Sequence, residues 1–311
     1  MVFKPSERTA HTGLELAGLM SACLPPGVLE VVVGDGSAGA ALSECDGVDV
    51  VAHVGSTVAG RAIAAAAAHT GAKVLLENGG NDPLVVDGDV DPGWAADQAA
   101  LGCFANAGQI CTSVERIYVV ESVAEAFLEA LVRRAQALVM GPGSAEHTQL
   151  GPLVDARLRE TVHGQVEEAV ASGAELLTGG VLPDGPGSFY PATVLDGCGP
   201  DLAVMREETF GPVAPVRVVP TFDAALEAAG QGRYGLAAVV LTSSMAHAQR
   251  AWRELPVGTV KVNAAFGGAP GGAAQPRGAS GSGFGYGPEL LDEMTTTKVV
   301  HLGLPHPPVP S

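Results

Sequence analysis

Two residues of the chain have side chains suited to covalent catalysis. Glu77 stands just before the pair Gly79-Gly80, and Cys111 follows thirty-four residues after Glu77. A cysteine acts as a nucleophile in its thiolate form, and a glutamate is a suitable base for activating water. Most cysteines are instead small buried hydrophobes, and most glutamates are solvated, so the pair alone leaves a structural role open. The segments around them decide between the two interpretations.

The cysteine pattern indicates reduced thiols. The five cysteines are odd in number and lack C-x-x-C spacing. This argues against a disulfide framework and against a zinc site, so we expect no metal centre. Apart from Cys111, a plain structural role is the expectation for each of them: Cys23, Cys45, Cys103 and Cys198.

Composition narrows the class of protein. With 311 residues, 47% of them hydrophobic and 16% charged, the chain is globular and long enough for about two domains. The net charge of −17 disfavours nucleic acid or an anionic membrane as a partner. No apolar run approaches the roughly 20 residues of a membrane span, and the first residues lack the apolar region of a signal peptide. We therefore expect a cytoplasmic protein.

The first third of the chain predicts alternating strands and helices. A strand ending at Phe3 precedes a helix over residues 12–23, and β-branched runs at 28–33 and 48–53 each lead through a glycine-rich turn into a further helix. Such β-α units indicate an α/β fold with a doubly wound parallel sheet, whose ligand lies at the carboxyl ends of the strands.

Each of the two glycine-rich turns offers a candidate nucleotide site. Residues 34–39 form a literal G-x-G-x-x-G, which is typical of dinucleotide binding and equally typical of an ordinary turn. In the second turn Gly55 precedes Ser56 and Thr57, either of which can cap the helix that runs to about Thr70. Free amides at that helix start would suit a pyrophosphate, and a plainly capped helix is the alternative.

The rest of the chain predicts elements that would present the two candidate residues. A strand over 73–76 delivers Glu77, and a helix over 92–104 leads into the turn that ends at Cys111. We expect further strands at 115–120, 213–219, 237–241, 259–262 and 295–302, helices at 123–138, 156–172, 223–229 and 245–254, and loops at 179–188 and 267–287.

Seven motifs, spread over nearly the whole chain, resemble those of the aldehyde dehydrogenase superfamily and occur in its order. They are Lys4-Pro5-Ser6-Glu7, Leu24-Pro25-Pro26-Gly27-Val28, Gly55-Ser56-Thr57, Glu77-x-Gly79-Gly80, Gly108-Gln109-x-Cys111, Glu207-Glu208-x-Phe210-Gly211-Pro212 and Val260-x-Val262-Asn263. Together they are highly specific. The resemblance implies an incomplete Rossmann-type cofactor domain over 1–79, an α/β catalytic domain over 80–280, and a C-terminal segment, 281–311, with an oligomerisation-type strand.

In this family the two candidate residues have assigned roles, which the resemblance carries to this chain. Cys111 corresponds to the nucleophile that adds to an aldehyde, giving a thiohemiacetal that passes hydride to the nicotinamide and leaves a thioester. Glu77 corresponds to the base that activates water to release the carboxylic acid. The implied partner is a small-molecule aldehyde, and homo-oligomers are the family's habit.

The resemblance also implies which residues hold the cofactor. Glu208 matches the residue that binds the nicotinamide ribose, Phe210 packs beside the cofactor, and Lys4 and Glu7 match the pair at the adenosine ribose. Ser56, next to Gly55, becomes a better phosphate contact than residues 34–39. A carboxylate at Glu7 would repel a 2′-phosphate, which favours NAD over NADP. A solvated side chain is the alternative for Lys4 and Glu208, and a core side chain for Phe210.

The chain departs from the family at its start. Family members carry roughly a further third before Lys4, including sheet strands and an asparagine that stabilises the oxyanion; a misassigned start or a broken gene would explain the difference. We expect an unpaired sheet edge and an exposed apolar face in the shortened chain. An alternative function follows: a catalytically inactive fragment, similar to aldehyde dehydrogenase, that binds nucleotide or a partner subunit.

Overall fold

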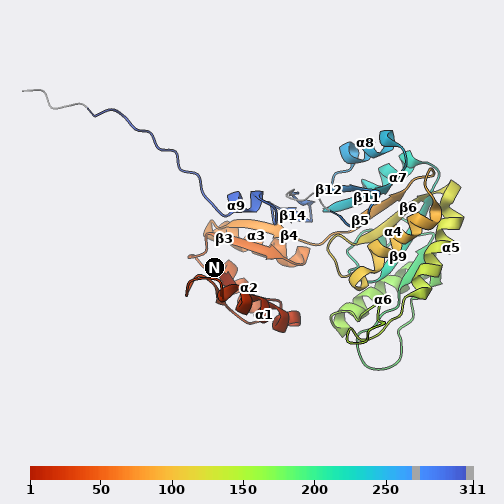
Figure 1. Ribbon diagram of the computed structural model, residues 1–311, viewed down its shortest axis with the longest axis horizontal. Helices are drawn as coiled ribbons and strands as arrows, with labels where there is room; N and C mark the ends of the chain where they lie inside the picture. The colour runs from red at the N-terminus through yellow and green to blue at the C-terminus, as the bar shows by residue number, and fades with distance from the viewer. Residues whose placement is uncertain (268–273, 306–311) are drawn as a thin grey trace, which may run out of the picture.

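The most deeply buried strands lie side by side in a seven-stranded sheet, ordered β12-β11-β5-β6-β9-β8-β7. Every residue of β5 (Asp82–Val86), β6 (Val114–Val120) and β11 (Ala237–Leu241) is buried, and these strands run parallel to one another. A parallel strand of this kind reads as a continuous apolar run because helices cover both faces of its sheet. The computed structural model describes residues 1–267 and 274–305, and Figure 1 shows this sheet at one end of the molecule.

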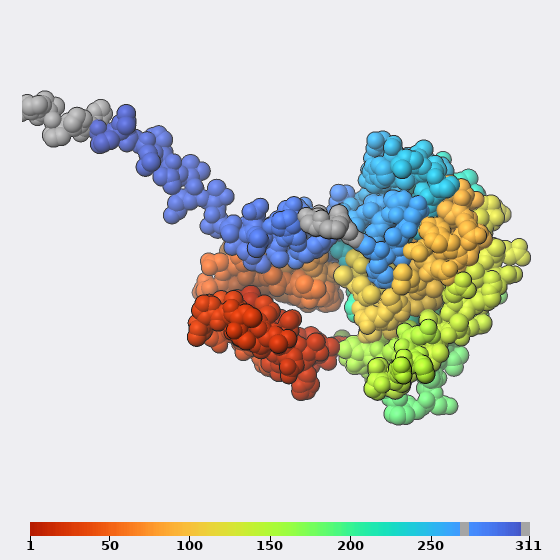
Figure 2. Space-filling view, viewed as in Figure 1, coloured from red at the N-terminus to blue at the C-terminus, as the bar shows by residue number. Residues whose placement is uncertain are grey.

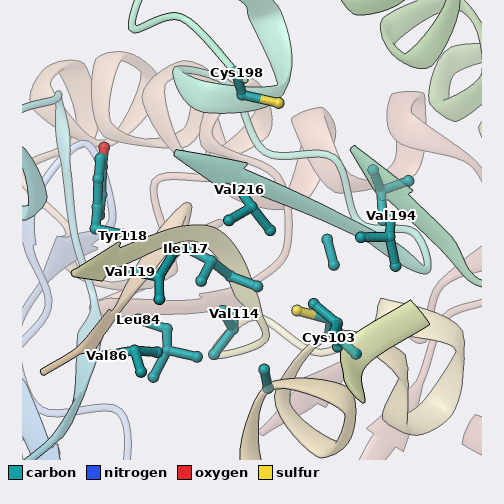
Figure 3. Packing of buried hydrophobic residues seen from close by; sticks show 14 of the residues in the cluster. Leu84, Val86, Cys103, Val114, Ile117, Tyr118, Val119, Val194, Cys198 and Val216 are labelled. Carbon is teal, nitrogen blue, oxygen red and sulfur yellow. The ribbon is translucent and has the colours of Figure 1, made fainter. Parts of the chain in front are cut away.

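The apolar side chains of this sheet form one core with the helices packed on it. Leu84 of β5 and Ile117 of β6 are fully buried, together with Cys103 of the helix α4 (Pro92–Phe104), as Figure 3 shows. α4 packs on β6 and β9, while α7 (Phe222–Ala229) packs on β5 and β6. The larger part of the molecule is therefore held by an ordinary hydrophobic core.

The remaining elements of the large part surround this core. They are α5 (Glu121–Ala137), α6 (Ala156–Ala171), β7 (Glu175–Thr178), β8 (Thr193–Asp196), β9 (Val213–Val219), α8 (Met245–Glu254) and β12 (Thr259–Val262), with a small β10 (Tyr234–Gly235) to β13 (Arg277–Gly278) pair and the 3₁₀ turns η2 (Ala105–Gly108) and η3 (Ala203–Met205).

A second, three-stranded sheet lies in the smaller part of the molecule and positions Glu77. Its order is β14-β4-β3, where β3 (Val50–Val54) and β4 (Lys73–Glu77) are parallel and are joined by α3 (Thr57–Thr70). β14 (Gly281–Ser282) pairs antiparallel with β4, opposite Glu77 itself. Strands far apart in the sequence thus form the sheet in which β4 carries the candidate base.

The first residues of the chain form a separate group beside this sheet. It contains the parallel pair β1 (Val2–Phe3) and β2 (Glu30–Val31), the turn η1 (Glu7–Thr9), and the helices α1 (Ala10–Ser21) and α2 (Gly36–Ser43). Figure 2 shows these elements, with the small sheet, as a lobe distinct from the larger part. Leu19 is 71% exposed and Val54 79% exposed, so the expected exposed apolar surface is present.

Most of the predicted elements are confirmed. The α/β fold is as expected, and the helices over 92–104 and 245–254 and the strands over 213–219, 237–241 and 259–262 have the predicted bounds. β2 is shorter than the predicted strand over 28–33. The sequence analysis missed β5, β7 and β8. In β5 the apolar run is only three residues long and follows a proline, and the burial that favours the strand comes from its neighbours.

Two predictions near the C-terminus are wrong. The segment 267–287 is not loop throughout, because β13 and β14 lie within it; residues 268–273 are outside the described part. The segment 295–302 is no strand. It extends away from the molecule in Figure 1, with Val299 90% exposed, and a strand forms only where another strand supplies backbone partners. α9 (Glu289–Glu293) precedes it.

Among the described residues, no helix has both the length and the apolar composition needed to cross a membrane.

The pairing of β14 with β4 depends on a glycine and can be tested. Gly281 has φ of 123°, and a Cβ there would overlap the carbonyl oxygen of Leu76. We expect Gly281→Ala to lower the free energy of unfolding by about 1–3 kcal/mol, measured by urea denaturation. Gly164→Ala is the control because it lies in α6 with open space around it, and it should stabilise by roughly 0.5–1 kcal/mol. Equal midpoints for the two variants would contradict this role of Gly281.

Candidate active site

A strained turn presents Cys111 at the start of β6. After α4 the chain passes through Asn106 and Ala107, which have positive φ values of 51° and 55°, and through Gly108 at 73°. A Cβ at Gly108 would overlap the carbonyl oxygen of Gly211, so this glycine permits the close approach of two backbones. Positive φ in residues other than glycine costs energy and persists where the surroundings impose it.

Side-chain hydrogen bonds hold the turn in this conformation. Nδ2 of Asn106 donates to the Gln109 carbonyl oxygen at 3.1 Å, and Nε2 of Gln109 donates back to the Asn106 carbonyl oxygen at 3.2 Å. Oε1 of Gln109 also accepts from the Val154 amide at 2.9 Å. Gln109 therefore ties the turn both to itself and to the chain before α6, and Cys111 is left with an exposed surface.

Three candidate residues meet at Gly79-Gly80. A Cβ at Gly79 would overlap the carboxylate of Glu208, and a Cβ at Gly80 would lie 2.5 Å from the carbonyl oxygen of Cys111. The Gly80 amide donates to Oε1 of Glu208 at 3.0 Å. Glu77 is the last residue of β4, separated from this pair by Asn78. Two consecutive glycines are needed here because a carboxylate and a peptide carbonyl occupy the space of their side chains.

Glu77 is half-buried and points toward the C-terminal segment. Its Oε1 accepts from the Gly285 amide at 3.0 Å, and its carbonyl oxygen accepts from the Gly55 amide, also at 3.0 Å. Burial raises the pKa of the Glu77 carboxyl, while the hydrogen bond from Gly285 opposes that rise. A glutamate with a raised pKa is the better proton acceptor near neutral pH.

The surroundings of Cys111 disfavour its thiolate. Although the residue has an exposed surface, the protein atoms around its thiol exclude part of the solvent and so raise its pKa, and the negative charges of Asp82, Glu77 and Glu208 raise it further; the Thr112 amide acts in the opposite direction. The tertiary structure brings these three carboxylates near one thiol. Because the pKa of Cys111 is raised, its thiol is mainly neutral at pH 7 in the chain without cofactor.

The predicted cofactor residues of the smaller lobe lie around two turns. Nζ of Lys4 donates to the Gly34 carbonyl oxygen at 2.8 Å and lies 3.5 Å from the carboxylate of Glu7. Ser56 is the N-cap of α3, and its Oγ accepts from the Ala59 amide at 3.2 Å. Gly55 leads into that cap. The structure therefore groups Lys4 with Glu7, and Gly55 with Ser56, in a lobe other than the one that carries Cys111.

Two buried carboxylates near the candidate site were not identified in the sequence analysis. Asp82 accepts from the Ala237 amide at 3.0 Å, and burial raises its pKa to about 8; Oδ2 of Asp82 has no partner in the described part of the chain. Glu115 is also buried; burial and the nearby charge of Glu208 raise its pKa, while hydrogen bonds from the Phe210 and Thr209 amides favour its carboxylate form. The sequence contained a signal for Glu115, which lies within a predicted strand, in Val114-Glu115-Arg116-Ile117. An acidic residue that is buried in a strand is usually paired or hydrogen-bonded.

Comparison with known proteins identifies the family of the chain. The sequence model described as the aldehyde dehydrogenase family matches residues 1–300. The chain belongs to this family. It is 39% identical to a betaine aldehyde dehydrogenase of Cereibacter sphaeroides over 313 aligned positions, which cover 98% of this chain and 63% of that protein.

Solved structures of this aldehyde dehydrogenase family share its fold. The lactaldehyde dehydrogenase of Escherichia coli has a TM-score of 0.93 at 34% identity, covering 97% of this chain and 64% of that one. An NAD-dependent aldehyde dehydrogenase from Sinorhizobium meliloti has a TM-score of 0.93 at 37% identity, covering 98% and 62%. The chain therefore spans less than two thirds of the length of these relatives.

The charges around Cys111 predict how its thiol reacts with iodoacetamide. In a chain with Cys23 and Cys45 changed to serine, we expect the alkylation rate of Cys111 to keep rising above pH 9.0, the ordinary thiol value, because the pKa is raised. Glu208→Gln removes one negative charge and should shift the profile to lower pH. Mass spectrometry of the labelled peptide measures the rate.

The control for that experiment is Asp97→Asn, which removes a surface carboxylate paired with Arg134 and should leave the profile unchanged. A profile with its midpoint below pH 9.0 in the parent chain would show that the carboxylates do not govern this thiol.

Proposed function

We propose that this protein oxidises an aldehyde to a carboxylic acid with NAD, through covalent catalysis by Cys111. The observation that carries the proposal is the junction at Gly79-Gly80, which brings the backbone of Cys111 and the carboxylate of Glu208 together, with the candidate base Glu77 two residues before it and its charge acting on the Cys111 thiol. Family membership supports the same chemistry. A solvated or purely structural role would not require a carboxylate and a carbonyl in the space of two glycine side chains.

Cys111 supplies the nucleophile in this mechanism. Its thiolate attacks the aldehyde carbon, forming a C–S bond and giving a tetrahedral thiohemiacetal. NAD, when bound, would supply the two-electron acceptor; loss of hydride from the thiohemiacetal carbon and of the proton from its hydroxyl leaves Cys111 as a thioester. Because the thiolate is the nucleophile, the proton must leave Cys111 before attack, and the raised pKa of the thiol opposes this transfer.

Glu77 acts in the second half of the reaction. Its carboxylate takes a proton from water, the resulting hydroxide attacks the thioester carbon, and the C–S bond breaks to return the Cys111 thiolate and release the carboxylic acid. The raised pKa of Glu77 suits it to this role, and the Gly285 amide orients the carboxylate while leaving its second oxygen for water.

The residues present fit an NAD-type cofactor. The Glu208 carboxylate uses one oxygen for the Gly80 amide and has the other for a ribose hydroxyl. The first-turn amides of α3, capped at Ser56, suit a pyrophosphate, and the Lys4–Glu7 pair provides a donor and an acceptor for the second ribose. The carboxylate of Glu7 favours NAD over NADP because it repels a 2′-phosphate.

The formation of NADH by the purified chain tests this proposal. With a panel of aldehydes we expect turnover that Cys111→Ala abolishes, while Cys23→Ala, which removes an exposed cysteine elsewhere, retains it. Glu77→Gln should still form NADH in the first turnover, but its steady-state rate should fall by about 10²–10⁴-fold because deacylation lacks its base. Absorbance in rapid-mixing and steady-state assays separates the two phases.

The outcomes distinguish the two candidate functions. No NADH above the Cys111→Ala background, combined with a higher melting temperature on addition of NAD, would favour the alternative of an inactive nucleotide-binding fragment. The observation that supports this alternative is that the chain spans 63% of the length of the betaine aldehyde dehydrogenase. Absence of both effects would refute cofactor binding by the 311-residue chain.

A further inference from the structure

Glu115 makes an unusual set of contacts for a buried carboxylate. It is the second residue of β6, and 4% of its surface is exposed. Its Oε1 accepts from the Phe210 amide at 2.8 Å, and its Oε2 accepts from the Thr209 amide at 2.9 Å and from Nδ2 of Asn81 at 3.3 Å. Each of these three hydrogen-bond partners is a donor. A carboxylate, which only accepts, fits this set of partners better than any neutral side chain.

The turn held by Glu115 is strained. Phe210 has φ of 53°, in the left-handed region that a bulky residue rarely adopts, and such strain persists only where the surroundings impose it. Two consecutive backbone amides, of Thr209 and Phe210, point at the two oxygens of one carboxylate. Without Glu115 both amides would lose their partner in a buried setting, where an unpaired amide is costly.

Side chains also hold the rest of this turn. Nδ2 of Asn81 donates to the Glu207 carbonyl oxygen at 3.0 Å, and Nε2 of Gln165 donates to the Glu208 carbonyl oxygen at 3.4 Å. The Thr209 hydroxyl donates to Oε1 of Gln165 at 2.8 Å. Residues 207–210 belong to no helix or strand, so these side chains replace the regular backbone ladder that would otherwise fix their conformation.

The two residues flanking Thr209 are those assigned to the cofactor. Glu208 directs its carboxylate to the Gly80 amide, and Phe210 carries the strained φ. We propose that Glu115 is a positioning residue, which fixes the turn over residues 207–210 so that Glu208 and Phe210 are preorganised for the cofactor. The inference rests on the proposed function, since it assigns those two residues to NAD. Glu115 itself reaches the cofactor only through the backbone that it holds.

The test compares Glu115→Gln with a buried carboxylate elsewhere. A glutamine presents one acceptor oxygen and one amide donor, so its NH₂ group must face a backbone N–H at this site. Asp87→Asn is the matched control: Asp87 is also buried, and it binds Thr242 and His247 beyond the opposite end of β5 from Asp82. Both variants lose a buried charge, and one of them touches the turn.

We expect Glu115→Gln to weaken NAD binding by about 10-fold in calorimetry, the size of losing one hydrogen bond to a charged group, and to raise the KM for NAD more than it lowers kcat. Asp87→Asn should change NAD affinity less than about twofold, even if its melting temperature falls as much as that of Glu115→Gln. The reason is that a substitution distant from the turn over residues 207–210 does not couple to it. Glu115→Asp, which keeps the charge on a shorter side chain, should recover part of the affinity and serves if Glu115→Gln does not fold.

Amide hydrogen exchange decides the proposal independently of NAD. Exchange in residues 207–210 should accelerate in Glu115→Gln by more than the change in global stability accounts for, and in Asp87→Asn by no more than that change accounts for. Unchanged exchange in this segment would overturn the positioning role even if NAD binds. A parent chain that binds no NAD would refute the proposed function, while the exchange result would still decide whether Glu115 fixes the turn.

Discussion

The arrangement of the candidate site depends on a close approach of three chain segments at Gly79-Gly80. The carboxylate of Glu208 occupies the space of one absent side chain, and the carbonyl of Cys111 occupies the other. Any side chain at either glycine would separate the base-bearing strand β4 from the start of β6. Because the two sheets of the molecule belong to different lobes, this contact joins the lobe that contains Lys4, Glu7 and Ser56 to the lobe that contains Glu208 and Cys111.

The same approach creates an electrostatic conflict. Bringing Glu77, Glu208 and Asp82 near one thiol raises the pKa of Cys111, which opposes the thiolate that the chemistry requires. Burial also raises the pKa of each of these three carboxyl groups. A site of this kind tolerates like charges at close range because each carboxylate has a separate backbone amide as donor: Gly285, Gly80 and Ala237. Perturbed groups gathered in this way are typical of catalytic sites.

Polar side chains hold both strained turns in place. Asn106 with Gln109 hold the turn before Cys111, and Glu115 with Asn81 and Gln165 hold the turn around Phe210. The two turns touch, since Gly108 lies against Gly211. The conformation of each turn therefore depends on the other, and the buried hydrogen bonds of Glu115 help to hold both.

The sequence by itself determined the motifs, the α/β class and the positions of Glu77 and Cys111, because local spacing and chain order carry that information. It predicted β9, β11 and β12 well, since apolar runs record burial directly. Only the tertiary structure decided that β14 pairs with β4, that residues 295–302 form no strand, and that Asp82 and Glu115 are buried beside the site. Each of these depends on a partner distant in sequence: a strand needs a second edge, and the role of a carboxylate is set by the donors that the fold brings to it.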